Sequence, residues 1–311
     1  MPRKLLYAVA FLALAFTLAA QQSPQPARHF DGQSWWAHVK FLADHSLEGR
    51  ETGSEGLRKA ESYAVDQFSK AGLQPAGTNG FYQPVKFVSR QIVENDSAAA
   101  LVVSGKTEPL TLGDDAYFTT RAELSSEEIT APLVFIGYGL KIPEKNYDDP
   151  SSFDLRGKIV VYLAGSSSDI PTALSAHYQT IGERWKSLKQ AGVIGTITIP
   201  NPASMDIPWS RMSLNRAHPS MDLADPEFNE TQGLKMAMTF NPAQAEKLFA
   251  ASGHTFEEIA ALGKDRKPLP HFPLGVSLKA HATVKTSPVE SANIVGKCQR
   301  RRGPARPCRP I

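Results

Sequence analysis

The sequence predicts an α+β chain in which a helical segment precedes a mostly β region with one β-α-β crossover. Up to about residue 72, apolar residues recur with the period of amphipathic helices. From Tyr82 onward, short runs rich in Val, Ile and Phe alternate with Gly, Pro and Asp turns. A strand, a helix and a second strand follow one another between Lys158 and Ile199, an order that indicates one parallel pair. The 311 residues, 41% of them hydrophobic, suffice for about two domains.

The N-terminus resembles an export signal. Residues 1–20 combine the basic pair Arg3-Lys4, an apolar run over 5–18 and small residues at the end. The run is short for a membrane span, which needs about 20 apolar residues. We therefore expect an exported protein, periplasmic or extracellular, with no membrane contact beyond the signal peptide. A retained N-terminal anchor is the alternative. Residues 21–33 follow as a Pro/Gln linker.

The C-terminus differs from the rest of the chain. Residues 297–311 hold six basic residues, no acidic residue and both cysteines, Cys298 and Cys308. Because the net charge of the whole chain is only +3, its basic character belongs to the ends and gives no reason to expect a nucleic-acid partner. A shifted reading frame or a sequencing error would explain this Arg/Pro tail. The two cysteines would then be accidents of the frame; in a genuine exported tail they could form a disulfide.

Residues 34–84 are expected to form a helical segment. A first helix is predicted over 34–43, with Ser34 as its N-cap. A second is predicted over about 54–71, started by the capping-box pattern of Thr52 and Glu55 and ended by Gly72. One stripe of this helix is apolar and should pack on a core: Leu57, Ala60, Ala64, Phe68 and Ala71.

Residues 85–285 are expected to form the β-rich region, and 286–296 the first strand of a further domain. A helix at 181–190 joins the strands 158–163 and 193–199. Two short helices are expected at 241–251 and 255–262, after a loop-rich stretch over 200–225. The remaining strands are expected at 85–93, 100–103, 133–137 and 276–284.

Several motifs occur in an order that resembles a known family. FLAD (41–44), LEGRETG (47–53), KAGLQP (70–75) and GFYQPV (80–85) together resemble the N-terminal cap of zinc-dependent aminopeptidases. These enzymes belong to metallopeptidase clan MH, with aminopeptidases Y and S, glutamate carboxypeptidase and the transferrin receptor among its members. LVFIGYG (133–139), NYDD (146–149), DLRGKIVV (154–161) and AGVIG (191–195) resemble the protease-associated (PA) domain inserted in many of them. SANIVG (291–296) resembles the strand that re-enters the zinc domain.

The resemblance implies a hydrolase that removes N-terminal residues from peptides or proteins with a water activated by two zinc ions. In this family the metal ligands are a His-x-Asp pair, a Glu-Glu pair, and a later Asp and His, all beyond the strand equivalent to 291–296. We therefore expect the family's α/β zinc domain to be missing from this sequence. No catalytic, metal-binding or substrate-binding residue is assigned, and the chain itself is expected to hold no zinc and to be inactive. A non-catalytic, exported PA-type binding module is the alternative, and the oligomeric state is left open.

Other residues could imitate such a site. His29 and Asp31 have the His-x-Asp spacing but precede the folded region, and Asp44, His45 and Glu48 could meet a cation near the first helix end. A turn or capping role is the simpler interpretation of the second group. The acidic pairs Glu127-Glu128 and Glu257-Glu258 are expected on a solvated loop and in the first turn of a helix. The serines at 166–168 are expected in a flexible loop, and a Ser-His pair between them and His177 is expected to be coincidental.

Overall fold

The computed structural model describes residues 31–298, which form two compact units. Of the described residues, 31–83 and 294–298 belong to the smaller unit, and Pro84–Asn293 form the larger unit. The predicted signal peptide, most of the linker and Cys308 lie outside the described residues, so export and a Cys298–Cys308 bridge stay predictions. Because the smaller unit contains both a segment before and a segment after Pro84–Asn293, the larger unit is an insertion in its sequence.

The smaller unit contains the two predicted helices, with different N-caps. Helix α2 spans Gly32–Leu42 and is capped by Asp31, whose carboxylate accepts the backbone N–H groups of residues 33 and 34. Ser34 is thus inside the helix, and its prediction as the cap was wrong. Helix α3 spans Glu55–Lys70 and is capped by Ser54, which accepts the N–H of Leu57. Thr52 lies too far before the first turn to reach that N–H group, so the predicted capping box does not form.

A short strand pair joins the two sequence segments of the smaller unit. Strand β1 (Gln74–Pro75) pairs antiparallel with strand β13 (Gly296–Lys297), and Gln74 lies opposite Lys297. Two backbone hydrogen bonds extend the pairing: the N–H of Ala76 donates to the carbonyl of Val295, and the N–H of Val295 donates to Phe81. The chain therefore leaves and re-enters this unit at adjacent points.

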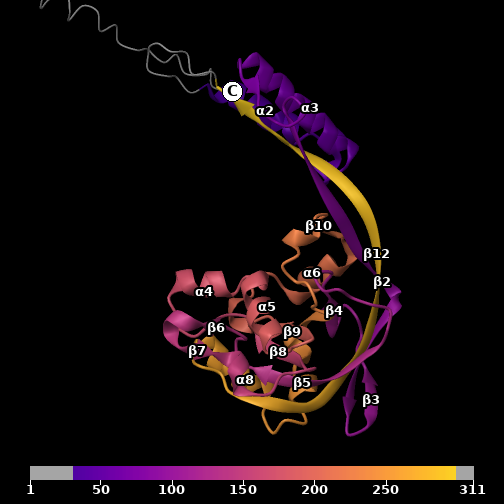
Figure 1. Ribbon diagram of the computed structural model, residues 1–311, viewed down its shortest axis with the longest axis vertical. Coiled ribbons are helices and arrows are strands. Elements are labelled where there is room, and N and C mark those ends of the chain that lie inside the picture. Colours follow the sequence, from indigo (N-terminus) through magenta and orange to yellow (C-terminus); the bar gives the residue numbers. More distant parts are fainter. Residues whose placement is uncertain (1–30, 299–311) are drawn as a thin grey trace, which may run out of the picture. The chain divides into compact units, whose positions relative to one another are not determined.

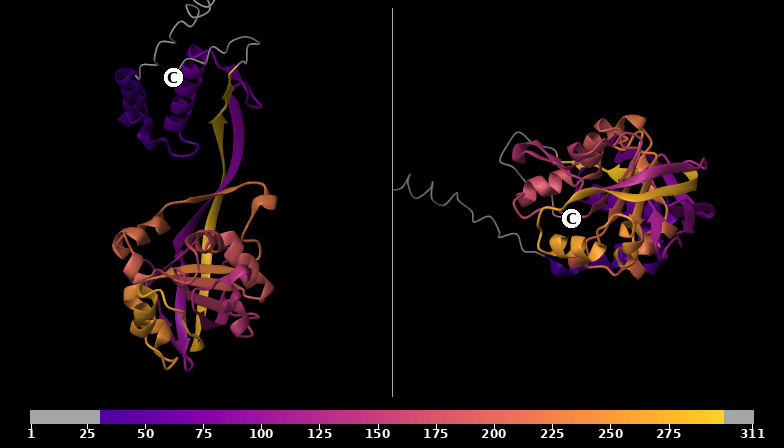
Figure 2. Two further views of the ribbon diagram at one scale, coloured as in Figure 1. Left: turned by 90° about the vertical axis from the view of Figure 1, so that its left-hand side faces the viewer. Right: turned by 90° about the horizontal axis from the view of Figure 1, so that it is seen from below.

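The larger unit is organised on a nine-stranded mixed sheet. Its strand order is β10-β2-β12-β5-β8-β9-β11-β4, with β3 paired to β2. The long strands β2 and β12 run side by side (Figures 1 and 2). The strands are β2 (Tyr82–Val103), β3 (Lys106–Pro109), β4 (Ala116–Phe118), β5 (Ile129–Ile136), β8 (Ile159–Leu163), β9 (Gly195–Ile199), β10 (Ser220–Leu223), β11 (Met236–Phe240) and β12 (His271–Ile294).

Strands β2 and β12 are longer than predicted. The sequence indicated a break between 93 and 100, but β2 is continuous there because its polar residues bond to β12. The backbone N–H of Thr283 donates to Ser97 Oγ, and the Thr283 hydroxyl donates to the carbonyl of Asp96. Strand β12 likewise joins the expected strand 276–284 to most of the segment 286–296.

Helix α5 (Ile181–Gln190) has the predicted bounds and connects the parallel strands β8 and β9 as expected. The sheet has more parallel strand pairs than the one predicted, since β5 also pairs parallel with β8, and β9 with β11. The β5–β8 connection was missed because it contains no α-helix. It passes through the hairpin β6 (Lys141–Ile142) and β7 (Tyr147–Asp148), flanked by the 3-10 helices η2 (Pro143–Lys145) and η3 (Asp149–Ser152).

Both faces of the central sheet are covered. Along β5, Phe135 belongs to an apolar cluster that includes residues of α7 and α8, whereas Val134 and Ile136 belong to a second cluster that includes Trp185 of α5. This alternation follows from the two-residue period of a strand. The remaining helices are α4 (Thr172–Tyr178), α6 (Trp209–Met212), α7 (Glu246–Phe249), α8 (Phe256–Lys264), η1 (His45–Arg50), η4 (Pro202–Ser204), η5 (Ser213–Ala217), η6 (Pro226–Phe228) and η7 (Pro242–Gln244). Within 31–298, no helix combines the length and the apolar composition needed to cross a membrane.

Candidate functional site

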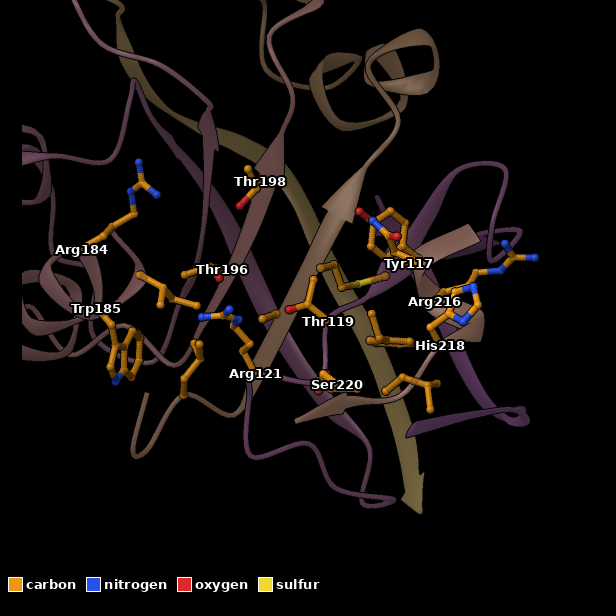
Figure 3. Close-up of a pocket in the computed structure, with 18 of the residues that line it drawn as sticks. Tyr117, Thr119, Arg121, Arg184, Trp185, Thr196, Thr198, Arg216, His218 and Ser220 are labelled. Atoms are coloured by element: carbon orange, nitrogen blue, oxygen red, sulfur yellow. The ribbon is translucent and has the colours of Figure 1, made fainter. Parts of the chain in front are cut away.

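A cavity of about 460 Å³ lies on the α5 side of the sheet in the larger unit. Strands β4, β8, β9 and β11 contribute to its lining, and helix α5 and the segment from η5 to β10 complete it. Its volume is within the range of about 300–1,000 Å³ that is usual for small-molecule sites. Figure 3 shows Arg184, Trp185 and Arg121 toward one side and Tyr117, Arg216 and His218 toward the other.

Polar side chains of two neighbouring strands are joined at the cavity. The hydroxyl of Thr198 on β9 donates to the phenol oxygen of Tyr162 on β8 at 2.6 Å. Arg184 of α5 covers the Tyr162 ring, with its guanidinium carbon 4.4 Å from the ring centre. The same guanidinium donates to the carbonyl of Gln179 at 3.2 Å and to the Tyr162 oxygen at 3.4 Å. These contacts hold the Arg184 side chain against the lining, an arrangement in which a cation is attracted to the aromatic face.

The charged groups of the lining are all basic. Arg121, Arg184, Arg216 and His218 contribute to it, and none of the lining residues is Asp or Glu. Arg216 is neutralised by Glu94, whose carboxylate lies 2.6 Å from its Nε. Neither Arg121 nor Arg184 has an acidic partner within ion-pair distance in the described part of the chain. The cavity therefore carries positive charge that no described carboxylate compensates.

Hydroxyl and aromatic groups line the space between the basic residues. Thr119, Thr196 and Thr198 lie between the two sides in Figure 3. Trp185 is 3% exposed, and its indole N–H donates to the carbonyl of Gln232, which fixes the ring. Thr120 and Ser220 are hydrogen-bonded to each other. A site built in this way can accept a ligand that combines an anionic group with an apolar part.

A wider depression of about 960 Å³ adjoins this cavity. Arg121 and Ile181 line both. Its lining includes acidic as well as basic side chains, such as Glu183 and Lys186, which form an ion pair at 2.5 Å. The depression therefore lacks the uniform charge of the cavity.

The residues that could imitate a zinc site have other roles. The Asp44 carboxylate caps η1 by accepting the N–H of Ser46, a role predicted from the sequence. Glu128 pairs with Lys279 at 3.1 Å. Glu258 forms a capping box with Thr255 in the first turn of α8, where Glu257 also lies. His29 lies outside the described residues.

Within residues 31–298, no group of three or more His, Cys, Asp and Glu side chains is arranged to hold a metal ion. The donor set that a two-zinc centre needs, with a bridging carboxylate and terminal His ligands, does not match the described residues. We therefore derive no chemical step through zinc for them.

A Ser-His-Asp sequence of hydrogen bonds is present at the start of β12. His271 Nε2 lies 2.8 Å from Asp149 Oδ1, and His271 Nδ1 lies 3.1 Å from the Ser152 hydroxyl. Sequence analysis missed this group because Asp149 and His271 are 122 positions apart. The other Asp149 oxygen accepts the backbone N–H of Leu140, so the carboxylate ties together the loop after β5 and the start of β12. Ser152 lies outside both cavities described above, and this group is therefore interpreted as structural.

The Ser-His pair considered in the sequence is not formed. Ser166 accepts a hydrogen bond from Ser175 at 2.7 Å, whereas the His177 ring packs edge-on against Tyr178. The described residues contain no bond between the two side chains, in agreement with their interpretation as a coincidental pair.

No protein-family model matches the chain, and no curated protein matches it. Among solved structures, it is similar to an aminopeptidase from Aneurinibacillus sp. strain AM-1, with 15% identity and a TM-score of 0.44 over 84% of this chain and 46% of that chain. It is also similar to BSAP, a zinc aminopeptidase from Bacillus subtilis, with 14% identity and a TM-score of 0.37 over 89% of this chain and 49% of that chain. The chain thus spans less than half the length of these two proteins, and this level of similarity does not assign it to a family.

Proposed function

We propose that the chain comprises the cap segment and the inserted PA-type domain of an exported protein of the zinc aminopeptidase type, and that its own contribution is to bind peptide rather than to hydrolyse it. The observation that carries this proposal is the pairing of β1 with β13. Gln74 and Lys297 lie opposite each other, although they are far apart in the sequence and the larger unit is inserted between them. An accessory domain inserted into a host domain has this connectivity.

The cavity supports a binding role for the inserted domain. It is lined by strands, one helix and two connecting segments, and it combines aromatic walls with hydroxyl and guanidinium donors. Peptides offer the complementary groups, namely apolar side chains, backbone carbonyls and carboxylates. By contrast, Asp44, Glu128 and Glu258, which could imitate parts of a zinc site, have capping or ion-pair roles, which supports assigning hydrolysis elsewhere.

The test is to incubate the purified protein with unblocked peptides, with and without added zinc. Release of N-terminal amino acids should stay at the rate of a protein-free control, and peptides should bind measurably. Zinc-dependent, saturable release of N-terminal amino acids by the protein alone would contradict a role in binding without hydrolysis.

A stand-alone binding module is the second candidate, and the cavity favours it, since its lining residues all belong to the larger unit. Sequencing the source DNA downstream of the Ser291 codon separates the two candidates. A continuous frame with a His-x-Asp pair and a later Glu-Glu pair supports the peptidase type, and its absence supports the stand-alone module.

A further inference from the structure

We infer that the cavity between α5 and the sheet is a carboxylate site, and that its ligand is the free C-terminal end of a short peptide with an apolar last residue. The inference rests on the proposed peptide-binding role and specifies which end of the peptide enters. Three features carry it: the uncompensated charge, the arrangement of donors, and the apolar wall beside them.

The charge points to an anion. Arg121 and Arg184 both line the cavity without an acidic partner in the described chain, whereas Arg216 is already paired with Glu94. A guanidinium group binds a carboxylate through two parallel N–H donors. The cavity thus has two guanidinium groups without an acidic partner, and it has no lining carboxylate that would repel an anion. Both features favour a negatively charged ligand.

The Arg184 side chain is pre-positioned. Its guanidinium group is held over the Tyr162 ring and is bonded to Gln179. Its Nε is buried and has no hydrogen-bond partner. Because the contacts with Tyr162 and Gln179 already fix the side chain, a carboxylate that accepts from this guanidinium pays little conformational entropy to order it.

The apolar wall indicates what carries the carboxylate. Trp185, Leu188 and Ile181 of α5 line the same cavity, beside Leu234 and Met238. Ile181 is the partly exposed member of this wall, and the other four residues are buried behind it. An apolar side chain of a ligand would cover Ile181 at the edge of this wall, whereas a bare inorganic anion would not. At about 460 Å³ the space suits a short segment rather than a folded partner. A peptide C-terminus therefore fits these features better than inorganic phosphate does.

Calorimetric titration with N-acetyl-Ala-Leu tests the inference, because this peptide keeps a free carboxylate and its blocked N-terminus is not an aminopeptidase substrate. The matched ligand is N-acetyl-Ala-Leu-amide, which differs only at the C-terminal group. We expect the amide to bind about 10-fold to 100-fold more weakly, since a hydrogen bond to a charged group contributes about 1.5–3 kcal/mol. Arg184→Gln and Arg121→Gln should each remove most of the preference for the acid. Arg156→Gln should leave it unchanged, because Arg156 is exposed and pairs with Asp154 far from the cavity lining.

Each outcome has a distinct meaning. Equal binding of acid and amide overturns the carboxylate site and leaves the proposed peptide-binding role intact. If both arginine variants still bind the acid more tightly than the amide, the carboxylate does not bind in this cavity. Inorganic phosphate that binds more tightly than the acid overturns the ligand class. If neither short peptide binds, the carboxylate site is wrong, and titration with longer unblocked peptides then tests the peptide-binding role separately. Thermal unfolding of each variant, and Arg184→Lys, which keeps the charge, distinguish a lost ligand contact from a damaged fold.

Discussion

Tyr162 and Thr198 lie directly opposite each other on the parallel strands β8 and β9, and their hydroxyl groups are joined by a 2.6 Å hydrogen bond. The Tyr162 ring also supports the Arg184 guanidinium. This pair therefore links the sheet to the basic side of the cavity.

Replacing Tyr162 with Phe keeps the ring but removes the acceptor of the Thr198 hydroxyl. It also removes the longer, 3.4 Å bond from Arg184. We expect a loss of about 1–2 kcal/mol in the free energy of unfolding, mainly from the short bond to Thr198. Chemical denaturation measures this value. Tyr117→Phe is the matched control, since Tyr117 lines the same cavity and the substitution keeps its ring contact with Trp209. Equal effects of the two substitutions would show that the bond contributes nothing.

Removing the Asp149 carboxylate should destabilise the larger unit strongly. Asp149 is 2% exposed and bonds both His271 and the backbone of Leu140. We expect Asp149→Ala to lower the free energy of unfolding by about 3 kcal/mol, because buried partners are left unsatisfied. Asp154→Ala, at an exposed carboxylate, should change it by less than about 0.5 kcal/mol. Calorimetric unfolding compares the two.

Ser152→Ala tests whether the neighbouring Ser-His-Asp arrangement is structural. Ser152 is exposed and contributes one hydroxyl to His271. We expect only a small change in stability and no change in the rate of ester or peptide hydrolysis above a protein-free control. A hydrolysis rate that the wild type shows and the variant loses would make this group catalytic.

The stability of the larger unit should fall in strongly alkaline solution. Burial raises the pKa of Tyr138 to about 12, and its hydroxyl donates to the carbonyl of Lys267 at 2.9 Å. The pKa of an unfolded tyrosine is about 10. The fold therefore favours the protonated phenol, so this contribution is complete below about pH 10 and is lost as the pH rises from there toward 12.

Tyr138→Phe has no phenol to ionise and provides the comparison. The wild type should be the more stable protein at pH 8, and the difference should shrink as the pH passes about 10. Burial and Asp149 also raise the pKa of Tyr147, so Tyr138→Phe should retain part of the alkaline loss. If the difference in unfolding free energy between the wild type and Tyr138→Phe stays constant from pH 8 to 11, the raised pKa does not belong to Tyr138.

Gly56 is required by the close approach of α3 to η1. A Cβ atom at this position would lie 1.8 Å from the backbone carbonyl oxygen of Leu47. We expect Gly56→Ala to cost about 1–3 kcal/mol and to reduce hydrogen-exchange protection in α3 while leaving the β8–β9 pair protected. Gly182→Ala is the matched helical control, because the nearest atoms there belong to the flexible Glu230 side chain. Equal loss of protection in both units would contradict a local effect.

Much of the α+β fold could be predicted from local patterns. The helix at 181–190 and its parallel strands follow from periodicity, since α5 shows one apolar stripe and β8 is a continuous buried run. The continuity of β2 could not be predicted, because Glu94, Asn95 and Asp96 look like a turn and become strand only through their pairing with β12. The second and third parallel pairs were missed because their connections hold only 3-10 helices and the four-residue helix α6, which are too short to leave a periodic signal.

The cavity could not be predicted from the sequence. Its basic residues come from the segment after β4, from α5 and from η5, so no spacing connects Arg121, Arg184 and Arg216. Only the pairing order of the sheet brings them together. One signal was available, since Trp185 and Leu188 place an apolar face beside Arg184 on one helix, but such a face is equally typical of a helix that only packs on a core.

The most direct test of binding without hydrolysis measures both the binding and the cleavage of an unblocked peptide in one sample. The peptide Ala-Ala-Leu is titrated into the purified protein with added zinc, and nuclear magnetic resonance reports both its bound fraction and its integrity over several hours. We predict saturable binding that Arg184→Gln weakens, with the peptide remaining intact. Zinc-dependent release of its N-terminal alanine, or the absence of binding at millimolar peptide, would contradict the central claim.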